Sequence, residues 1–216
     1  ISPVLDYKIG HIDCVMNVAS ESHVDRSIEE PAPFIQNNVA LVCSMLDWAR
    51  VRNVQKFLHV STDEVYGPAP LGHNHKEWES FYPSNPYSAS KAAQESIAFS
   101  YWRTYGVPLV ITNTMNIIGE MQDPEKFIPM TIKRVLNGDK VTIHSDSTKT
   151  IPGSRHYIHA KDVADGLLFL LNLKGVEFEK DYGGAKCPKF NLVGPEEIDN
   201  LSLAKMIAAA QGKELN

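Results

Sequence analysis

The chain has little of several features that would narrow its class at once. It contains only three cysteines in 216 residues, Cys14, Cys43 and Cys187, and no two of them stand in a C-x-x-C spacing. A disulfide framework or a cysteine-rich metal site is therefore not predicted, and the unpaired thiols indicate a reducing, cytoplasmic setting. No apolar run approaches the ~18 residues that a membrane-spanning helix needs, so a membrane location is not expected either.

An excess of positive charge is also missing. The 21 Lys and Arg residues are scattered along the chain and are outnumbered by 26 Asp and Glu, which gives a net charge of -5. Nucleic-acid binding is therefore not expected. Finally, the 13 glycines nowhere form G-x-G-x-x-G or G-x-x-G-x-x-G, the loops that hold the pyrophosphate of a dinucleotide.

What the chain does have is an alternation of apolar strands and amphipathic helices. Short apolar runs at 13–19, 56–62 and 108–114 are typical of buried strands, and the segments 31–52 and 87–105 have apolar residues at helical spacing. Strand, helix, strand, helix, strand with continuously apolar strands predicts right-handed βαβ units. The predicted fold class is α/β, a Rossmann-like, doubly wound parallel sheet.

The pattern loosens after residue 115. A smaller, mixed lobe is expected there, built from a short apolar segment at 141–144, a strand at 190–194, and helices at 127–138, about 161–172 and about 201–211.

Two adjacent carboxylates, Asp63 and Glu64 in the stretch STDEVYG, directly follow the predicted strand 56–62. Ligands of parallel sheets bind beyond the carboxyl ends of the strands. Neighbouring carboxylates can have their pKa values driven apart, so that one acts as an acid and the other as a base, while the Thr62 hydroxyl holds a substrate oxygen. The alternative is a turn aspartate followed by a solvated glutamate.

Tyr87 and Lys91 are four residues apart in a predicted helix and therefore share one face. A nearby ammonium favours the phenolate, so Lys91 would lower the pKa of Tyr87 and make it a usable general base. The alternative is a tyrosine that anchors the start of the helix beside a solvated lysine, because Y-x-x-x-K is common by chance.

Several stretches together resemble the extended short-chain dehydrogenase/reductases, and among them the NAD-dependent epimerase/dehydratase family. They are STDEVYG, PYSASK, ASESHVDRSIEEP, FIQNNV and TNTMN followed by DPEKFIP. The similarity runs from about residue 12 to 211. The triplet Thr-Asp-Glu is most similar to nucleotide-sugar 4,6-dehydratases of the dTDP-glucose type, since related epimerases lack the acidic pair.

The resemblance implies a reaction and a role for each of these side chains. Tyr87, assisted by Lys91, takes the proton of the sugar 4-hydroxyl while a hydride passes from C4 to NAD⁺, and Thr62 holds the C4 oxygen. Glu64 then removes the C5 proton and Asp63 protonates the departing 6-hydroxyl. The hydride returns to C6, Glu64 reprotonates C5, and this lyase releases a nucleotide-linked 4-keto-6-deoxyhexose.

The resemblance also implies binding residues and a homodimer. The expected cofactor-binding residues for NAD are Val18, Ala19, Ser20, Asn37, Ser61, Tyr87 and Lys91. The expected residues for the nucleotide-diphosphate hexose are Ser22, Thr62, Asn116, Lys126, Arg155 and Asn191. For the weaker matches, an ordinary turn or surface polar group is the alternative. The base and the hexose are not specified by these positions.

Departures from the family pattern lead to further expectations. Ile117 replaces an asparagine that would contact the cofactor, and the loop 148–159 is long, which affects the placement of Arg155. Because the Gly-rich loop is missing, we expect an internal fragment that lacks about two βαβ units and is inactive alone. Residues 1–115 would be the C-terminal part of the NAD-binding Rossmann domain. Residues 116–216 would be mostly the substrate-binding lobe, with about 159–194 returning to the first domain.

Two rival functions and one rival site stay open. A nucleotide-sugar 4-epimerase or uronate decarboxylase would keep Tyr87 and Lys91 without needing both carboxylates, and a non-catalytic descendant of the family would need none of them. His73 and His75 stand one residue apart, but no third ligand at a fixed spacing joins them, so no metal site is predicted.

Overall fold

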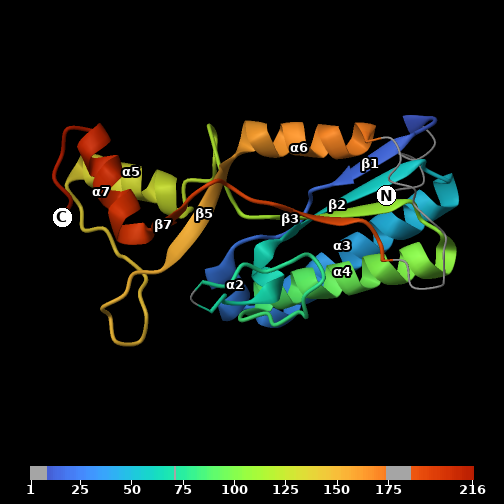
Figure 1. The fold of residues 1–216 in the computed structure, drawn as a ribbon, viewed down its shortest axis with the longest axis horizontal. Coiled ribbons are helices and arrows are strands. Elements are labelled where there is room, and N and C mark those ends of the chain that lie inside the picture. The colour runs from blue at the N-terminus through green and yellow to red at the C-terminus, as the bar shows by residue number, and fades with distance from the viewer. Residues whose placement is uncertain (1–8, 71, 174–185) are drawn as a thin grey trace. The chain divides into compact units, whose positions relative to one another are not determined.

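Parallel strands form the main sheet of the protein, which we describe from a computed structural model over residues 9–70, 72–173 and 186–216. The strands are β1 (Cys14–Asn17), β2 (Lys56–Thr62), β3 (Leu109–Thr114) and β6 (Lys189–Leu192), in the order β1-β2-β3-β6 (Figure 1). Each neighbouring pair is parallel. The predicted α/β class with a parallel sheet is confirmed.

The two central strands are buried along their whole length, apart from the first residue of β2. Their register pairs Phe57 with Leu109 and Thr62 with Thr114, so both strands end at the same edge of the sheet. Burial on both faces explains why these strands are continuous apolar runs rather than alternating ones. It also means that polar residues at their ends emerge together.

Helices α3 (Pro31–Arg52) and α4 (Pro86–Tyr105) pack against each other on one side of the sheet (Figure 1). Both begin with proline at the first turn, where no backbone donor is lost, and α4 ends at Gly106 in the left-handed conformation. The core beneath them is fully buried and includes Val42, Leu46, Phe57, Leu109 and Ile111.

The opposite side of the sheet carries the C-terminal part of α6 (Ala160–Asn172), from Leu167 onward (Figure 1). The ammonium of Lys56, at the start of β2, donates to the backbone carbonyl of Leu171. In the described part of the chain no helix combines the length and the hydrophobicity needed to cross a membrane.

The chain divides into two compact units, each continuous in space but not in sequence. Unit 1 comprises residues 1–114 and 167–192 and holds the main sheet, α3, α4, the short helix α2 (Val24–Glu29) and the 3₁₀ turn η1 (Asp63–Tyr66). Unit 2 comprises residues 115–166 and 193–216.

Unit 2 is built on a small mixed sheet. Strand β5 (Ser154–His159) pairs in parallel with β4 (Asn116–Ile118) and antiparallel with β7 (Glu197–Asp199). Helices α5 (Phe127–Asn137) and α7 (Asn200–Ala210) pack against each other in the same unit. Three-residue strands such as β4 and β7 carry no recognisable periodicity, which is why the sequence did not predict them.

Candidate active site

The acidic pair lies in η1, the single turn that directly follows β2. The hydroxyl of Thr62 accepts a hydrogen bond from the Glu64 N–H at 3.4 Å and donates to Oδ1 of Asp63 at 3.2 Å. Thr62 is extended whereas the next residues are helical, so the chain leaves the sheet at this residue. Both carboxylates are half-buried in the first turn beyond the strand end.

Asn85 connects Glu64 to the start of α4. Its side-chain N–H donates to Oε2 of Glu64 at 3.1 Å, while its own oxygen accepts from the Ser88 N–H at 2.8 Å. The Ser88 hydroxyl in turn accepts from the Asn85 N–H at 3.1 Å, which completes a capping box. A helix cap therefore also orients one carboxylate of the pair.

Tyr87, in the first turn of α4, is fixed by two neighbours. Its backbone N–H donates to the Ser27 hydroxyl at 3.1 Å, and its ring meets Phe34 edge to face at 6.4 Å between centroids. Its phenol lies within hydrogen-bonding distance of Thr62. It is also close enough to Glu64 for the two groups to interact electrostatically. The fold thus brings together Thr62, Glu64 and Tyr87, three of the predicted catalytic residues.

The electrostatics of Tyr87 differ from the expectation for a Y-x-x-x-K pair. Burial raises the pKa of the phenol above its ordinary value of 10, the Glu64 carboxylate raises it further, and the hydrogen bond with Thr62 opposes this only in part. We expected Lys91 to lower the pKa of Tyr87. Instead, desolvation and the nearby carboxylates dominate, and the phenol is protonated at neutral pH.

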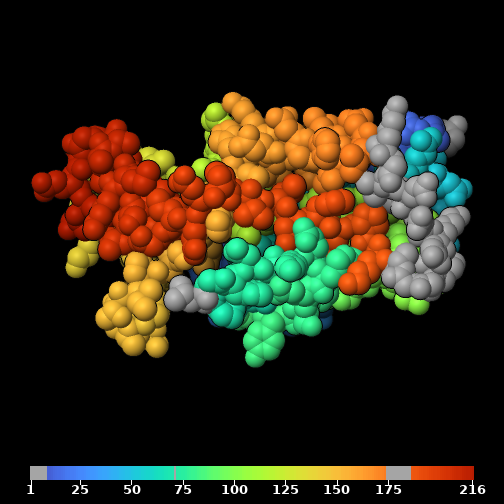
Figure 2. All heavy atoms as spheres, viewed as in Figure 1, coloured from blue at the N-terminus to red at the C-terminus, as the bar shows by residue number. Residues whose placement is uncertain are grey.

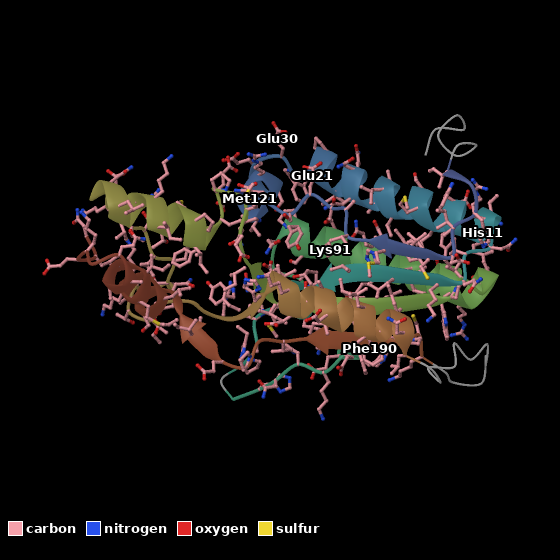
Figure 3. The ribbon with its side chains drawn as sticks, turned by 90° about the horizontal axis from the view of Figure 1, so that it is seen from above. His11, Glu21, Glu30, Lys91, Met121 and Phe190 are labelled. Atoms are coloured by element: carbon pink, nitrogen blue, oxygen red, sulfur yellow. The ribbon has the colours of Figure 1, made fainter. Side chains whose placement is uncertain are left out.

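Lys91 lies one turn further along α4, and Figure 3 shows it, with Glu21, toward the opposite end of the sheet from His11. Its side chain is only 2% exposed, and the ammonium donates to the carbonyl oxygen of Val60 on β2 at 2.8 Å. Burial lowers its pKa to about 8, although the carboxylate of Glu95 opposes that shift. The ammonium therefore contacts the strand rather than a carboxylate.

A fully buried asparagine, Asn38, organises the segment that follows β1. Its oxygen accepts from the Ser20 hydroxyl at 3.1 Å and from the Glu21 N–H at 2.8 Å, and its amide donates to the Ser90 hydroxyl at 2.9 Å. The predicted cofactor residue Asn37 instead donates to the carboxylate of Glu21 at 2.5 Å. The side chain of Asn38 therefore links the segment after β1 to both long helices.

Sequence reasoning named Asn37 and missed Asn38, although a signal was present. Phe34, Asn38 and Val42 are four residues apart, so Asn38 lies on the buried face of α3, where a polar residue needs a partner. Asn85 was missed too, because its contact with Glu64 joins residues 21 positions apart.

The remaining predicted cofactor residues lie at the ends of β1 and β2. Val18 and Ala19, just after β1, are exposed. Ser61, the penultimate residue of β2, is buried, and its hydroxyl has no hydrogen-bond partner among the described residues. A buried hydroxyl without a partner beside an exposed apolar segment suits contact with a bound molecule.

Asn191, at the end of β6, holds the segment that follows η1. The Tyr66 hydroxyl is 3.1 Å from both the side-chain oxygen of Asn191 and the carbonyl oxygen of Glu77. The Asn191 amide also donates to the carbonyl of His75 at 3.2 Å. This side chain, predicted to lie near a substrate, is thus engaged with the segment 75–77.

The other predicted substrate residues fall in both units. Ser22 is exposed in unit 1, shortly before α2. Asn116 in β4, Lys126 at the N-cap of α5 and Arg155 in β5 belong to unit 2. The guanidinium of Arg155 donates to the carbonyl of Ser154 at 2.7 Å. Ile117, where the family pattern has asparagine, pairs with Ile158 in the mixed sheet.

One further cluster lies outside these residues. His73, His75 and Glu79 bring two imidazoles and a carboxylate together in the segment between η1 and α4. The sequence spacing had not identified the third group, Glu79.

Comparison with known proteins identifies relatives of this chain. A family model described as the NAD dependent epimerase/dehydratase family matches residues 5–182. The chain is 35% identical over 209 residues to the low-salt glycan biosynthesis protein Agl12 of Haloferax volcanii, covering 97% of this chain and 63% of that protein. It is 38% identical over 211 residues to a dTDP-glucose 4,6-dehydratase of Streptomyces antibioticus, covering 98% and 58%.

Solved structures with the same fold include members of both branches of this family. DesIV, a dTDP-glucose 4,6-dehydratase from Streptomyces venezuelae solved with NAD and TYD bound, has a TM-score of 0.83 at 30% identity and covers 98% of this chain and 61% of its own. The UDP-glucose 4-epimerase of Thermus thermophilus, in complex with NAD, has a TM-score of 0.85 at 26% identity, covering 98% and 66%. By family match, relatives and fold, this chain belongs to the NAD dependent epimerase/dehydratase family.

Proposed function

We propose that this protein is a nucleotide-sugar 4,6-dehydratase, a lyase that converts a nucleotide-diphosphate hexose into its 4-keto-6-deoxy product with NAD. The observation that carries the proposal is the placement of Asp63 and Glu64 at the end of β2, with Glu64 close to Tyr87 and Thr62. A base, an acid and a hydrogen-bonding hydroxyl then face the same reaction centre. The names of the relatives support the same activity.

Each side chain has a distinct task in this proposal. Tyr87 accepts the proton of the sugar 4-hydroxyl as C4 is oxidised, and Thr62 hydrogen-bonds the C4 oxygen. Glu64 removes the C5 proton that the new ketone acidifies, and Asp63 gives a proton to the departing 6-hydroxyl, so that one water is lost. Because Glu64 is held by Asn85, the base has a fixed position relative to the phenol.

The end of the sheet fits a nicotinamide cofactor. The buried hydroxyl of Ser61 lacks a partner among the described residues, and the exposed Val18 and Ala19 with the half-buried Ser20 follow β1 at the same edge. We assign Ser61, Val18, Ala19, Ser20, Asn37, Tyr87 and Lys91 to cofactor binding. When bound, NAD⁺ supplies reversible hydride acceptance and a positive charge that favours the Tyr87 phenolate.

Unit 1, which includes residues 167–192 of the returning segment, would then be the cofactor-binding part, and unit 2 would be mostly the substrate-binding lobe. Lys126 and Arg155 offer the positive charge that a sugar diphosphate requires, and a planar guanidinium suits phosphate oxygens well. We assign Ser22, Thr62, Asn116 and Asn191 to the same substrate.

The test is a product analysis with the protein expressed from its complete coding sequence, supplied with NAD and a panel of dTDP- and UDP-hexoses. We expect a product lighter by one water that carries a 4-keto-6-deoxy group. Inversion at C4 with the 6-oxygen retained would instead identify a 4-epimerase, and loss of carbon dioxide from a uronate would identify a decarboxylase. No turnover of any of these substrates would favour a non-catalytic family member.

Three variants separate the steps, and solvent deuterium entering C5 reports the proton transfer. D63N is expected to exchange the C5 proton but to lose water slowly. E64Q should lose both exchange and dehydration while still oxidising C4, and Y87F should lose all three. Equal defects in D63N and E64Q would contradict the assigned division of roles.

A further inference from the structure

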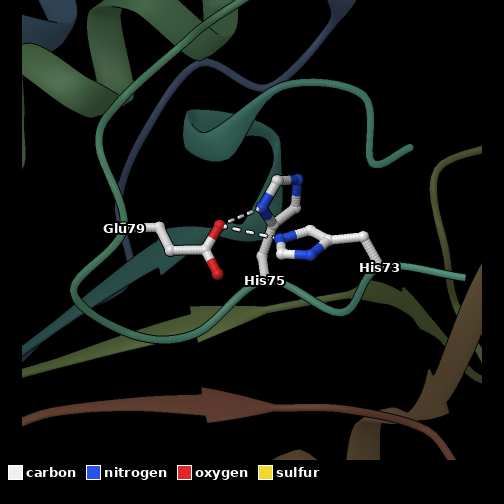
Figure 4. Close-up of side chains that lie close together, drawn as sticks. All are labelled: His73, His75 and Glu79. Carbon is white, nitrogen blue, oxygen red and sulfur yellow. Dashed lines mark hydrogen bonds and ion pairs between the residues drawn. The ribbon is translucent and has the colours of Figure 1, made fainter.

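We propose that His73, His75 and Glu79 form a binding site for a divalent transition-metal ion of the zinc class (Figure 4). The three side chains lie in the segment between η1 and α4, and their ligand atoms are all within 4.8 Å of one another. The proposal concerns this loop and does not depend on the proposed reaction.

The separations between the ligand atoms suit one small ion. Oε2 of Glu79 is 3.0 Å from Nε2 of His73 and 2.7 Å from Nδ1 of His75. Zinc binds nitrogen and oxygen ligands at roughly 2.0–2.1 Å, which in a tetrahedron places neighbouring ligand atoms ~3.3 Å apart. To admit the ion, the two contacts of Glu79 would lengthen by roughly 0.3 and 0.6 Å, and the two imidazole nitrogens lie within 4.8 Å of each other.

The ligands are held in place by contacts outside the cluster. The ring of His75 stacks on Tyr66 at 5.4 Å between centroids, and the ring of His73 meets that of His75 edge to face at 5.0 Å. The Lys76 N–H donates to the second oxygen of Glu79 at 2.9 Å, which fixes the carboxylate. Such supporting hydrogen bonds are typical of built metal sites.

The ligand set favours particular metals and a moderate affinity. Two imidazoles and one carboxylate suit Zn²⁺, Co²⁺ or Ni²⁺ rather than Mg²⁺, which prefers oxygen ligands. With three protein ligands, water would complete the coordination. Nε2 of His75 would carry the ring proton, and it has no hydrogen-bond partner among the described residues, so we expect a dissociation constant in the micromolar range.

An ion at this site would cross-link three residues of a loop that other contacts already hold to the body of unit 1. The segment is closed at its far end by the Tyr82 N–H, which donates to the Val65 carbonyl at 2.9 Å, and in the middle by the contact of His75 with Asn191. Residues 72–83 lie on the surface in Figure 2, where solvent and ions can reach them. Metal binding would therefore stabilise the segment between η1 and α4.

The test is calorimetric titration of the untagged protein with ZnCl₂, and with MgCl₂ as a comparison. We expect one zinc site per chain, no magnesium binding, and a loss of at least roughly tenfold in zinc affinity in H73Q and in E79Q. H144Q, which removes an exposed histidine elsewhere, is the matched control and should bind as the wild type does. Equal affinity in all four proteins would mean an adventitious ion only.

Hydrogen exchange provides a second measurement that does not rely on stoichiometry. Zinc should slow amide exchange over residues 72–82 in the wild type and H144Q but not in H73Q, whose stacking of His75 on Tyr66 is intact. Protection elsewhere, or equal protection in H73Q, would overturn the proposal.

Discussion

The side-chain amide of Asn85 donates to the carboxylate of Glu64 at 3.1 Å while the oxygen of the same amide caps helix α4 at the Ser88 N–H, 2.8 Å away. One residue thus both starts the helix that carries Tyr87 and Lys91 and orients the carboxylate that faces Tyr87. Helix stability and the position of the proposed base are therefore coupled through a single side chain.

Replacing Asn85 with aspartate separates these two tasks. Aspartate retains the capping oxygen, so the free energy of unfolding should change by less than about 0.5 kcal/mol. It also removes the donor to Glu64 and places a second negative charge beside that carboxylate, so Glu64 is no longer held in position by this contact. The rate of dehydration should therefore fall although the stability is retained. An unchanged rate with normal stability would show that Asn85 does not position the base.

Lys91 predicts a rise in stability at alkaline pH. Its pKa falls from the ordinary value of 10.5 to about 8 on folding, so between these values the unfolded chain binds more protons than the folded one. Stability therefore increases with pH across this window, by up to about 3 kcal/mol. Urea unfolding at several pH values should show this gain relative to K91M. Parallel pH dependences of the two proteins would contradict it.

The buried pair Lys189–Glu95 predicts strong coupling. The two charges are 2.7 Å apart with 1% and 0% of their side chains exposed, and Asn113 donates to the other Glu95 oxygen at 2.7 Å. K189M or E95Q alone leaves a buried charge uncompensated and should cost about 3–5 kcal/mol. The double variant should cost clearly less than the sum of the two, as a double-mutant cycle measures. Additive effects would mean that the charges do not interact.

Gly67, the last residue of STDEVYG, predicts a steric requirement. Its φ is +79°, and an added Cβ would overlap the carbonyl oxygen of Tyr82. Gly72 has a similar φ of +77° with nothing within 4 Å, so G72A is a matched control that includes only the conformational cost, about 1–2 kcal/mol. G67A should lower the free energy of unfolding by more than this. Equal losses of unfolding free energy in G67A and G72A would show that the loop at Tyr82 moves to accommodate the added Cβ at no cost.

The parts of the fold predicted best from the sequence are those with strong periodicity and clear ends. The predicted strand 56–62 and helix 31–52 match β2 and α3 residue for residue. In both cases burial dictates an apolar pattern, and for α3 a proline marks the start and the left-handed Asn53 follows the end. The helix α2, by contrast, is six residues long and mostly polar, so it has no apolar periodicity from which it could be predicted.

The chemistry of the site was less accessible to sequence reasoning because it depends on tertiary contacts. The spacing of Tyr87 and Lys91 places them on one helix face, but it does not specify that the ammonium reaches the Val60 carbonyl on another element. Desolvation, which raises the pKa of Tyr87, is likewise a property of the packed molecule. Residue types were predictable, whereas their protonation was not.

The pairing of β6 with β3 has a kinetic consequence. Strand β6 follows the whole first stretch of unit 2, residues 115–166, in the sequence, yet it supplies Lys189 to Glu95 and Asn191 to Tyr66 in unit 1. On a ribosome, these partners emerge long after the helix that carries Glu95 has left the exit tunnel. Closing such a long loop costs entropy and makes the pairing of β6 with β3 intrinsically slow. We therefore expect Glu95 to meet its counter-ion, Lys189, late in folding.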